Sequence, residues 1–598
     1  MDLFAAFNSD AYKLGHSEMY SEGTSLVVNN LTPRSDKIYR RTCTSYYDGK
    51  LVFFGAQGAI MEVVENWDKF FAMDKEIAVG RFKRLCDFML GEGVIKTDGL
   101  EKLHDLGYLP LEIRTLDEGD KVKMGIPVMT VRNTVDHAFW LVNFLETTLS
   151  HLTWKSSTTA TIAAEYKAMM TDFAVRTGVD LGFVLFQGHD FSSRGMSGPE
   201  DAARSGIGHM GSFLGTDSLG SILYLEQYYK AKGFIAGSVP ATEHAVATSN
   251  ILRIERELAN GLYFWKEDSE EMYEIYKKMV SDKVDARLVA EMVFLYELMK
   301  KFPKGILSYV TDSFDFWGVL NIGLPYMKEV IEAREGTLVI RPDSGDPVEV
   351  ICGVKIHDFS VHTTAEILAD NNYNGEAWDS VDDTAYYYTG EIKDEEATFY
   401  VRSSDGDVIE VDAYYEYNRY EAEYSMCSYR ARLADLTPEQ KGAAQMLLEL
   451  FGSTDTDKGY KQYAPCIGLI YGDSITTGRC LEILTRLEGK GYASSCAVFG
   501  VGSFTYNCLT RDTFGFAVKA TYTRVNGEDI AIFKDPKTDS KKKSAKGLLY
   551  VEKDQGEYGL IDNVTEEQFE FSENALKVRF LNGVFYNQTS IDEVRAKL

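Results

Sequence analysis

The chain has 598 residues, of which 45% are hydrophobic and 13% aromatic, and its 63 basic and 91 acidic residues give a formal net charge of −28. This length exceeds one ordinary hydrophobic core, so we expect two or more domains, and the aromatic content excludes a disordered chain. A charge this negative repels polyanions, which excludes nucleic acid and anionic membrane surfaces as partners.

The eight cysteines are scattered and include no CxxC pair. This usage predicts reduced thiols packed in the core of a cytoplasmic protein, not a zinc site or a disulfide framework. The first residues, MDLFAAFNSDAYK, lack the basic and long apolar regions of a signal peptide. No stretch approaches an uncharged membrane span, so we expect a cytoplasmic globular protein without a membrane partner.

Two segments far apart in the chain are expected to form β structure. YLPLEIRTLDEGDKVKMGIPVMTVRNT (108–134) alternates like strands separated by Gly and Pro turns. TYTRVNGEDIAIFKD (521–535) places Asn-Gly between two apolar runs, which predicts a hairpin. We therefore predict that residues 1–150 and 515–598 together build a mostly β domain.

A repeating unit begins at Gly182: a short apolar strand, a polar tip and a helical stretch. The strand-and-tip segments are GFVLFQGHDFSSRG, GSFLGTDS, AGSVPATEH, GILSYVTDSFD, GTLVIRPDSGD, CIGLIYGDS and SCAVFGVGS. This pattern predicts parallel strands joined by helices, in an open doubly wound sheet or a closed βα barrel. A seven-unit barrel over 151–349 and 464–514 is favoured, because a barrel gathers every strand tip at one mouth.

Residues 350–463 interrupt this repeat. The stretch EIKDEEATFYVRSSDGDVIEVDAYYEYNRYEAEY is acidic, rich in tyrosine and patterned like hairpins. So long a segment between two barrel units predicts an insertion with a small fold of its own.

The first tip, HDFSSRG (189–195), follows the apolar run GVDLGFVLFQ, which predicts a buried strand. It crowds His189, Asp190, Phe191 and Arg194 into six residues, where a turn of Gly, Pro or Asn is usual. An acid, a ring and a guanidinium at one strand end suggest a binding site, although a single polar tip is more often a capped turn.

The last two tips suit a phosphorylated sugar. In VFGVGSFTYNCLTRD (498–512), Gly500, Gly502 and Ser503 let backbone N–H groups at a helix start face an anion, and Arg511 adds charge. In YGDSITTGR (471–479), Asp473 suits sugar hydroxyls. The glycines alone are a weak signal, because a tight turn also needs them. The basic run KKKSAK (541–546) is either a solvated loop or an anion-binding loop.

Three further tips carry acids and one carries a histidine. Arg341 and Asp343 share the tip RPDSGDP, where a simple structural ion pair is an equal alternative. With Asp312 and Asp217 they suit a polyhydroxylated, phosphorylated ligand bound with Mg²⁺. His244 is core filler, a general base or a nucleophile.

Ten short motifs occur in an order that resembles the nicotinamide phosphoribosyltransferases, within the type II phosphoribosyltransferase family. They are DAYKLGH (10–16), TPRS (32–35), HDFSSRG (189–195), GTDS (215–218), SVPATEH (238–244), TDSFD (311–315), RPDSGDP (341–347), YGDS (471–474), LTRD (509–512) and FKDP (533–536). The resemblance covers nearly the whole chain outside 350–463, and it implies an α/β fold with an irregular seven-unit βα barrel.

The resemblance implies transfer of phosphoribose from phosphoribosyl pyrophosphate to nicotinamide in NAD salvage, with Mg²⁺ as cofactor. ATP is implied as co-substrate, hydrolysed through a phosphohistidine, in a homodimer with shared active sites. The implied catalytic residues are His244, Asp312 and Asp343, and no metal ligand is identified. The implied nicotinamide contacts are Phe191, Arg194 and Asp217, with Tyr12 from the second subunit. The implied ribose and phosphate contacts are Arg341, Gly472, Asp473, Gly502, Ser503, Arg511 and Lys519. The implied diphosphate or ATP contacts are Arg34, Lys534 and Lys546.

Two departures and three alternatives accompany the resemblance. Ser503 replaces the second glycine of the family's usual pair, and Ala517 stands at a phosphate-side serine. Asp217 favours the amide of nicotinamide over the carboxylate of nicotinate, whereas Arg194 favours nicotinate; Asp217 as a helix N-cap is the structural alternative. A nicotinate phosphoribosyltransferase and a catalytically inactive regulator that binds a phosphosugar are the alternative functions.

Overall fold

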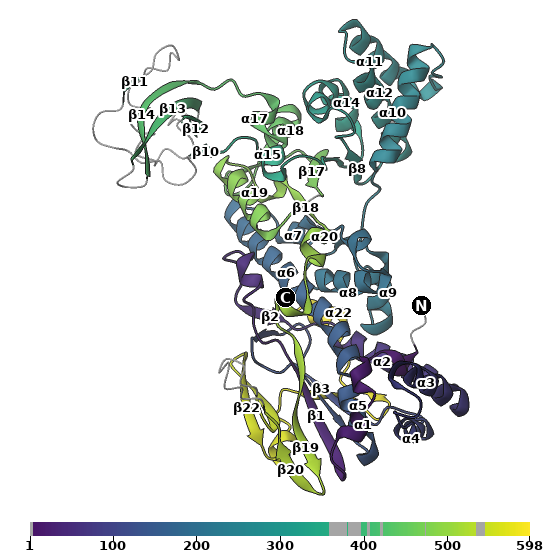
Figure 1. Cartoon of the computed structure of the whole chain (residues 1–598). Coiled ribbons are helices and arrows are strands. Elements are labelled where there is room, and N and C mark those ends of the chain that lie inside the picture. The colour runs from purple at the N-terminus through teal and green to yellow at the C-terminus, as the bar shows by residue number, and fades with distance from the viewer. Residues whose placement is uncertain are drawn as a thin grey trace. The chain divides into compact units, whose positions relative to one another are not determined.

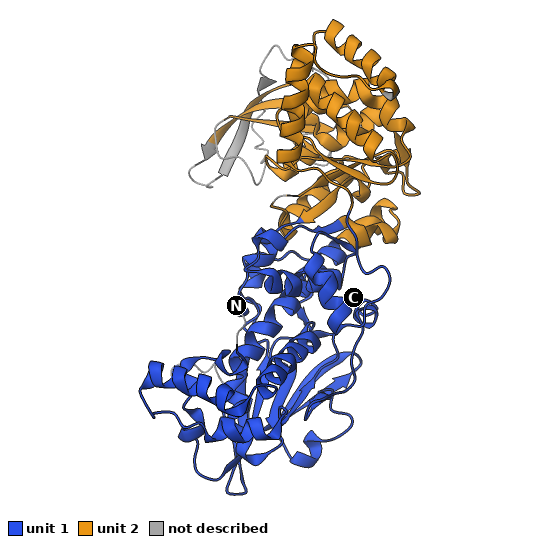
Figure 2. Cartoon of the chain, turned by 90° about the vertical axis from the view of Figure 1, so that its right-hand side faces the viewer, with its two compact units in different colours: residues 1–169, 188–238, 501–598 blue, residues 170–187, 239–500 orange. Residues whose placement is uncertain are grey.

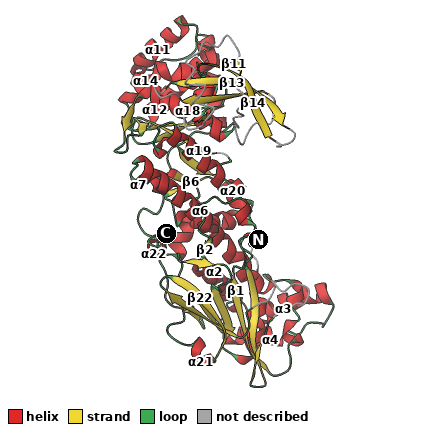
Figure 3. Cartoon of the chain, turned by 90° about the vertical axis from the view of Figure 1, so that its left-hand side faces the viewer, coloured by secondary structure: helices red, strands yellow, loops and turns green. Residues whose placement is uncertain are grey.

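The computed structural model describes residues 4–357, 379–380, 396–402, 407–418, 423–472, 474–533 and 545–598. These residues form two compact units, which Figure 2 colours separately. Unit 1 contains Met1–Met169, Gly188–Ser238 and Val501–Leu598, and unit 2 contains Met170–Gln187 and Val239–Gly500. Figure 1 follows the chain by residue number and Figure 3 by secondary structure.

Unit 1 contains a seven-stranded antiparallel sheet built from both ends of the chain. Its order is β20 (Glu528–Ala531), β19 (Ala517–Val525), β1 (Thr24–Thr32), β5 (Met129–Asn133), β3 (Leu111–Thr115), β23 (Lys577–Leu581) and β24 (Val584–Phe585). Two further antiparallel pairs are β2 (Lys50–Val52) with β4 (Lys121–Lys123) and β21 (Leu548–Asp554) with β22 (Glu557–Val564). Among the described strands, those from the two flanks of the chain pair directly only in the seven-stranded sheet, where β1 pairs with β19 and β3 with β23.

The predicted hairpin at Asn526-Gly527 is confirmed. Val525 and Glu528 face each other across β19 and β20, and both turn residues have positive φ, 52° and 79°. A two-residue hairpin needs this backbone because it matches the twist of the strands, and Asn and Gly adopt it at low cost. The chain ends are also tied by Gln57, whose side chain bonds the backbone of Thr589 in both directions, at 3.0 and 2.7 Å.

The helices of unit 1 are α1 (His16–Met19), α2 (Ala56–Phe71), α3 (Lys75–Leu90), α4 (Asp98–Leu106), α5 (Phe139–Phe144), α6 (Glu146–Thr177, up to Met169), α8 (Pro199–Met210), α9 (Leu219–Tyr228), α20 (Ser503–Asn507), α21 (Glu566–Phe569) and α22 (Ile591–Arg595). Helices α2, α6, α8, α9 and α22 contribute apolar residues to one core that includes Ile207, Met210 and Leu225. Unit 1 also contains the parallel pair of β6 (Gly188–Asp190) and β7 (Gly215–Thr216).

Unit 2 contains parallel strands in the order β18 (Val498–Val501), β17 (Ile467–Tyr471), β9 (Leu338–Arg341) and β8 (Leu307–Val310). Short, nearly continuous apolar runs are typical of parallel strands covered on both faces. The helices are α7 (Leu181–Gln187), α10 (His244–Ala259), α11 (Glu270–Ser281), α12 (Ala286–Lys301), α13 (Phe316–Gly318), α14 (Leu324–Ala333), α15 (Pro347–Cys352), α17 (Pro438–Lys441), α18 (Ala443–Phe451) and α19 (Thr477–Gly489).

Two details of the predicted barrel differ from the structure. The run before HDFSSRG is not a strand: it forms helix α7, and strand β6 begins only at Gly188. Leu181 and Phe186 are exposed, whereas Val184 is buried, as on a helix with one inward face. The third predicted strand, in AGSVPATEH, forms only isolated bridges at Gly237 and Ala241. The seven-unit barrel is therefore not confirmed.

The predicted insertion carries a five-stranded sheet, in the order β10 (Ile356–His357), β12 (Glu396–Arg402), β13 (Val408–Asn418), β14 (Glu423–Leu433) and β11 (Asp379–Ser380). Its core includes Val401, Ile409 and Val411, while charged residues such as Asp412 alternate with them. The chain leaves and returns at one place, because the N–H of Val354 donates to the carbonyl of Gln440 at 2.9 Å. Gly353 and Gly442 face each other there, both with positive φ, and a methyl group on Gly442 would lie 2.3 Å from the nitrogen of Gly353.

The cysteines are unbridged thiols, as predicted, but only some of them are buried in the core. All eight cysteines are free thiols, of which Cys86, Cys352, Cys480 and Cys496 are buried and Cys508 is exposed. Among the described residues, no helix is both long and apolar enough to cross a membrane.

Candidate active site

In unit 2, His244 and Asp312 form a hydrogen-bonded pair. His244 is the first residue of α10, and Asp312 follows β8. The His244 Nε2 lies 2.9 Å from Oδ1 of Asp312. The carboxylate accepts, so Nε2 carries the proton and donates it. The Asp312 side chain is 4% exposed and that of His244 is 47% exposed, so the buried acid orients an accessible imidazole.

The turn after β9 completes the shell of Asp312. The backbone N–H of Asp343 donates to Asp312 Oδ2 at 2.9 Å, and the Ser344 hydroxyl donates to the same oxygen at 2.6 Å. Burial on its own would raise the pKa of Asp312. The hydrogen bonds from Ser344, the Asp343 N–H and His244 outweigh burial, so the pKa of Asp312 is lowered. Asp312 is therefore a stable ionised carboxylate that accepts a hydrogen bond from His244.

Arg341, at the end of β9, donates from its guanidinium to the backbone carbonyl of Thr242. The Thr242 hydroxyl in turn accepts from the N–H of Val310, at 2.8 Å. These bonds fix the segment that leads into His244. The guanidinium of Arg341 thus bonds the backbone of this segment, whereas the sequence predicts ribose or diphosphate as its partner. Gly472 directly follows β17, while Asp473 lies outside the described residues.

In unit 1, the tips of β6 and β7 bring Phe191 and Asp217 together. The Asp217 N–H donates to the Asp190 carbonyl at 3.0 Å, and the Phe191 N–H donates to the Val501 carbonyl at 3.0 Å. The Asp217 carboxylate accepts from the Ser238 hydroxyl and lies 3.1 Å from Nε2 of His189. The N-cap of α9 is Ser218, so Asp217 does not serve as that cap.

Asp190 and Arg194, both in HDFSSRG, have different surroundings. Asp190 is buried, and one oxygen accepts from the N–H and the hydroxyl of Ser192, at 2.9 and 2.6 Å. This oxygen holds the turn in shape, whereas the other oxygen of Asp190, Oδ2, is buried without a hydrogen-bond partner among the described residues. Arg194 is exposed, in a single 3₁₀ turn over Ser193–Gly195.

The predicted phosphate turn packs directly on that loop. Gly502 is the N-cap of α20, and Ser503 is the first residue of this helix. A methyl group on Gly195 would lie 2.1 Å from the Ser503 hydroxyl, so only glycine fits there. Asn507 donates to the Gly195 carbonyl at 2.7 Å and accepts from the buried Lys155 at 3.2 Å. Two motifs some 300 positions apart therefore form one structural element of unit 1.

Other predicted cations of unit 1 are exposed on separate elements. Arg511 lies 3.3 Å from Asp512, and Lys519 lies 3.5 Å from Glu146. Arg34 donates from Nε to the Gly515 carbonyl at 3.0 Å. Lys546 lies over the ring of Phe533 at 5.9 Å, whereas Lys534 lies outside the described residues.

Tyr12 is 64% exposed, in a 3₁₀ turn that is anchored by Lys13. The Lys13 ammonium donates to Glu146 at 2.8 Å, the same carboxylate that Lys519 approaches. Ala517, the departure on the phosphate side, is buried at the start of β19.

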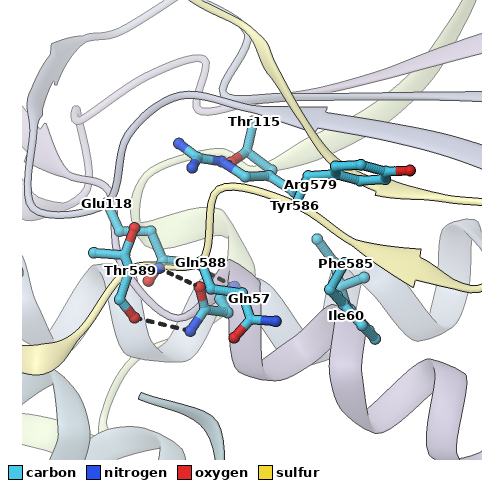
Figure 4. Close-up of a pocket in the computed structure, with 9 residues that line it drawn as sticks. All are labelled: Gln57, Ile60, Thr115, Glu118, Arg579, Phe585, Tyr586, Gln588 and Thr589. Carbon is cyan, nitrogen blue, oxygen red and sulfur yellow. Dashed lines mark hydrogen bonds between the residues drawn. The ribbon is translucent and has the colours of Figure 1, made fainter. Parts of the chain in front are cut away.

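Sequence reasoning predicted no contact or role for four residues that shape these groups: His189, Ser238, Ser344 and Asn507. Each lies within a quoted motif or next to one, but its role depends on a contact with a distant segment. Figure 4 shows a different pocket in unit 1, where Gln57 is hydrogen-bonded to Thr589 through its side chain and to Glu118 through its backbone N–H. None of the predicted site residues lines that pocket. Across the described ranges, no three His, Cys, Asp or Glu side chains are grouped as a metal site.

Comparison with known proteins gives the context for this geometry. Residues 186–584 match the model of the nicotinate phosphoribosyltransferase (NAPRTase) family. The chain is 41% identical to a nicotinamide phosphoribosyltransferase of Acinetobacter baylyi, over 98% of this chain and 96% of that protein. It is 27% identical to one of Xanthomonas campestris, over 98% and 97% of the two chains.

Among solved structures, the crystal structure of human nicotinic acid phosphoribosyltransferase matches with a TM-score of 0.50 and 12% identity, over 98% of this chain and 92% of that chain. This likeness concerns the fold, a mixed α/β architecture with a parallel half-barrel sheet. The family match covers both the HDFSSRG tip and the turn that begins α20. The chain belongs to the nicotinate phosphoribosyltransferase family.

Proposed function

We propose that this enzyme transfers the phosphoribosyl group of 5-phosphoribosyl 1-pyrophosphate to nicotinamide, giving nicotinamide mononucleotide and pyrophosphate in NAD salvage. The pyridine nitrogen forms a bond to the anomeric carbon while the bond from that carbon to pyrophosphate breaks. The observation that carries the choice of pyridine is the Asp217 carboxylate, half exposed at the tip of β7 beside Phe191. The relatives named nicotinamide phosphoribosyltransferase support it.

The pyridine is assigned to unit 1. Phe191 stacks on one face of the ring, and Asp217 accepts the amide N–H₂, because an ionised carboxylate is a strong acceptor. Arg194 lies beside the amide oxygen. Tyr12 of a second subunit covers the other face in a homodimer, which its exposure in this chain supports.

The phosphoribosyl group needs positioning more than acid–base chemistry, because the transition state has oxocarbenium character. The N–H groups at Gly502 and Ser503 take the 5′-phosphate, with Arg511 and Lys519. Gly472 and Asp473 take the ribose hydroxyls, with Arg341 steadying the turn. Arg34, Lys534 and Lys546 take diphosphate or ATP.

Magnesium is assigned to the diphosphate itself. The absence of a carboxylate cluster among the described residues fits an ion held mainly by phosphate oxygens and one or two carboxylates. Asp343 is the carboxylate we assign to it, since both Asp312 oxygens already accept hydrogen bonds. When bound, the ion stabilises the charge that develops on the leaving pyrophosphate.

ATP coupling is assigned to His244. Because Nε2 donates to Asp312, Nδ1 is the nitrogen with a lone pair for attack on the γ-phosphorus of ATP. The new N–P bond forms as the bond to the ADP oxygen breaks, and Asp312 stabilises the positive imidazole. Water later hydrolyses the phosphohistidine. A cytoplasmic location completes the proposal, supported by eight unbridged cysteines.

A second candidate is nicotinate phosphoribosyl transfer, favoured by the exposed guanidinium of Arg194 at the same tip. One assay separates the candidates: nicotinamide or nicotinate with phosphoribosyl pyrophosphate and Mg²⁺, with and without ATP. We expect nicotinamide to be preferred and ATP to raise the yield. We expect Asp217→Ser to lower kcat/KM for nicotinamide and to narrow the preference by at least about tenfold. Preference for nicotinate, or an unchanged ratio in the variant, contradicts the assignment, and no turnover at all favours a regulatory protein.

A further inference from the structure

The imidazole of His189 lies against the Asp217 carboxylate. Its Nε2 is 3.1 Å from Asp217 Oδ1, and its side chain is 11% exposed while that of Asp217 is 49% exposed. A carboxylate only accepts, so Nε2 carries a proton whether the ring is neutral or charged. The ring therefore stays bonded to Asp217 in both states and changes only its charge.

Two neighbours pack closely against the ring of His189. His189 faces Gly215 in the β6–β7 register, and a methyl group on Gly215 would lie 2.7 Å from Nδ1 of His189. On another side, the ring of Phe191 lies 4.7 Å away, centroid to centroid, inclined at 52°. The His189 ring thus contacts two of the residues assigned to the pyridine, Asp217 and Phe191.

We propose that His189 determines which pyridine Asp217 accepts. This inference rests on the proposed function. With neutral His189, Asp217 keeps its full negative charge, accepts the amide of nicotinamide and repels the carboxylate of nicotinate. With protonated His189, the pair carries no net charge, and the repulsion that excludes nicotinate is removed. Selectivity for the amide therefore falls as His189 gains a proton.

The other polar groups around the His189 ring do not supply a change of charge beside Asp217. Asp190, on β6, is held by Ser192, and the Ser238 hydroxyl has no charge to gain. His209, on α8, accepts from Tyr506 at Nδ1 (2.8 Å) and donates to the Gly215 carbonyl (3.0 Å). Burial lowers the pKa of His209 to about 4, against the opposing effect of Asp190, so this ring stays neutral. Arg194, in the loop that follows Phe191, stays positively charged throughout the physiological pH range.

The test is the ratio of kcat/KM for nicotinamide to that for nicotinate, measured from about pH 5.5 to 8, a range where histidine changes charge. Effects common to both substrates cancel in this ratio. We expect the wild-type ratio to fall by up to about fivefold toward low pH, as expected for a partly exposed ion pair. His189→Gln keeps an N–H donor but cannot gain charge, so its ratio stays flat. The matched control Ser238→Ala removes a donor but keeps the imidazole, so its slope remains.

A binding measurement provides an independent readout. Calorimetry of nicotinate binding in buffers of different ionisation enthalpy should show net proton uptake by wild type within the same pH range, and none by His189→Gln. Nicotinamide should show no uptake in either protein. A flat wild-type ratio, or a wild-type slope in folded His189→Gln, overturns the inference. If Asp217→Ser leaves the ratio unchanged, the proposed function is at fault; if only the His189 result fails, the proposed function stands.

Discussion

The candidate residues of the two units differ in how far the protein itself satisfies their polar atoms. In unit 2, Asp312 accepts three hydrogen bonds and is almost fully buried. In unit 1, Arg511 and Lys519 are more than half exposed and pair only loosely with acids. The orientation of His244 is therefore set before any ligand binds, whereas we expect Arg511 and Lys519, which we assign to phosphate, to be positioned only by the ligand. Substitutions in the two groups should therefore fail in different ways.

The largest expected effect is at Asp312. In Asp312→Asn one amide N–H₂ must face either the N–H of His244 or that of Asp343, so one donor is left without an acceptor. We expect ATP hydrolysis to fall by about 10⁴-fold, as when a histidine loses its orienting carboxylate. His244→Ala should abolish it but keep ATP-independent synthesis, because this residue does not attack the sugar. Ser344→Ala, which removes one of three bonds, is the control and should retain most activity.

An ATPase rate in folded His244→Ala equal to that of wild type would refute the phosphohistidine. In contrast, we expect Lys519→Ala in unit 1 to raise KM for phosphoribosyl pyrophosphate and leave the ATPase rate nearly unchanged. If His244→Ala and Lys519→Ala lowered the ATPase rate to the same extent, the two groups of residues would not differ in function.

The second effect concerns stability in unit 2. Glu291, on α12, is 1% exposed and accepts from the Tyr309 hydroxyl at 3.0 Å. Burial, reinforced by Asp315 and Asp312 and opposed by the Tyr309 bond, raises the pKa of Glu291 to about 8. The folded state thus binds the proton more tightly than the unfolded state, so stability is full below the unfolded pKa and declines as pH rises toward 8.

Glu291→Gln keeps an oxygen for Tyr309 and has no charge to lose. We expect it to exceed wild type in free energy of unfolding by up to about 4 kcal/mol at pH 8, with the gap closing toward pH 5. Urea titrations at four pH values measure this gap. A gap independent of pH would mean that Glu291 does not titrate in this range.

The third effect concerns the pyridine site of unit 1, to which we assign Tyr12 of a second subunit. Mixing Tyr12→Ala and Phe191→Ala chains should restore about a quarter of the sites if dimers form at random and each site takes Tyr12 from the other subunit. Phe191→Ala mixed with Asp217→Ala is the control, because both residues serve one site from one chain, and it should restore none. Absence of rescue in mixed dimers verified by mass spectrometry excludes shared sites.

The smallest expected effect is at the insertion. Because Val354 and Gln440 are hydrogen-bonded neighbours, replacing residues 355–439 with a short Gly/Ser bridge leaves both ends in place. We expect a folded protein that retains catalysis. A folded variant that no longer binds substrate would show that the insertion contributes to the site. Deleting 350–463 instead removes α18, whose Leu447 is buried in unit 2, and should unfold the protein.

The sequence predicted best where one local signal decides the structure. Asn526-Gly527 specifies its hairpin by backbone preference, and the runs LSYV and LVIR form the parallel strands β8 and β9. The run that became α7 has no period that separates strand from helix. Its helix is favoured by Gln187, whose buried amide donates to the carbonyls of Ser494 and Ala497, a contact that no local pattern reveals.

The same limit applies to the candidate site. The order of motifs places Phe191, Asp217 and Asp312 after strands, where the structure has them, whereas His244 begins helix α10 after isolated bridges. It does not reveal that His189 bonds Asp217, because this depends on the β6–β7 register. Nor does it show that Asp190 turns inward to Ser192, since a carboxylate at a strand end looks the same in sequence whether it binds a ligand or its own loop.

The joining of both chain ends in unit 1 determines when the protein can finish folding. Gln57 bonds Thr589 across 532 positions, and β1 pairs with β19. During synthesis, the edge of β1 that β19 will cover stays open until nearly the whole chain has left the ribosome. Residues 239–500 are continuous and can pack earlier. Nascent chains stalled before residue 517 therefore expose an unpaired strand, the kind of edge that chaperones protect from aggregation.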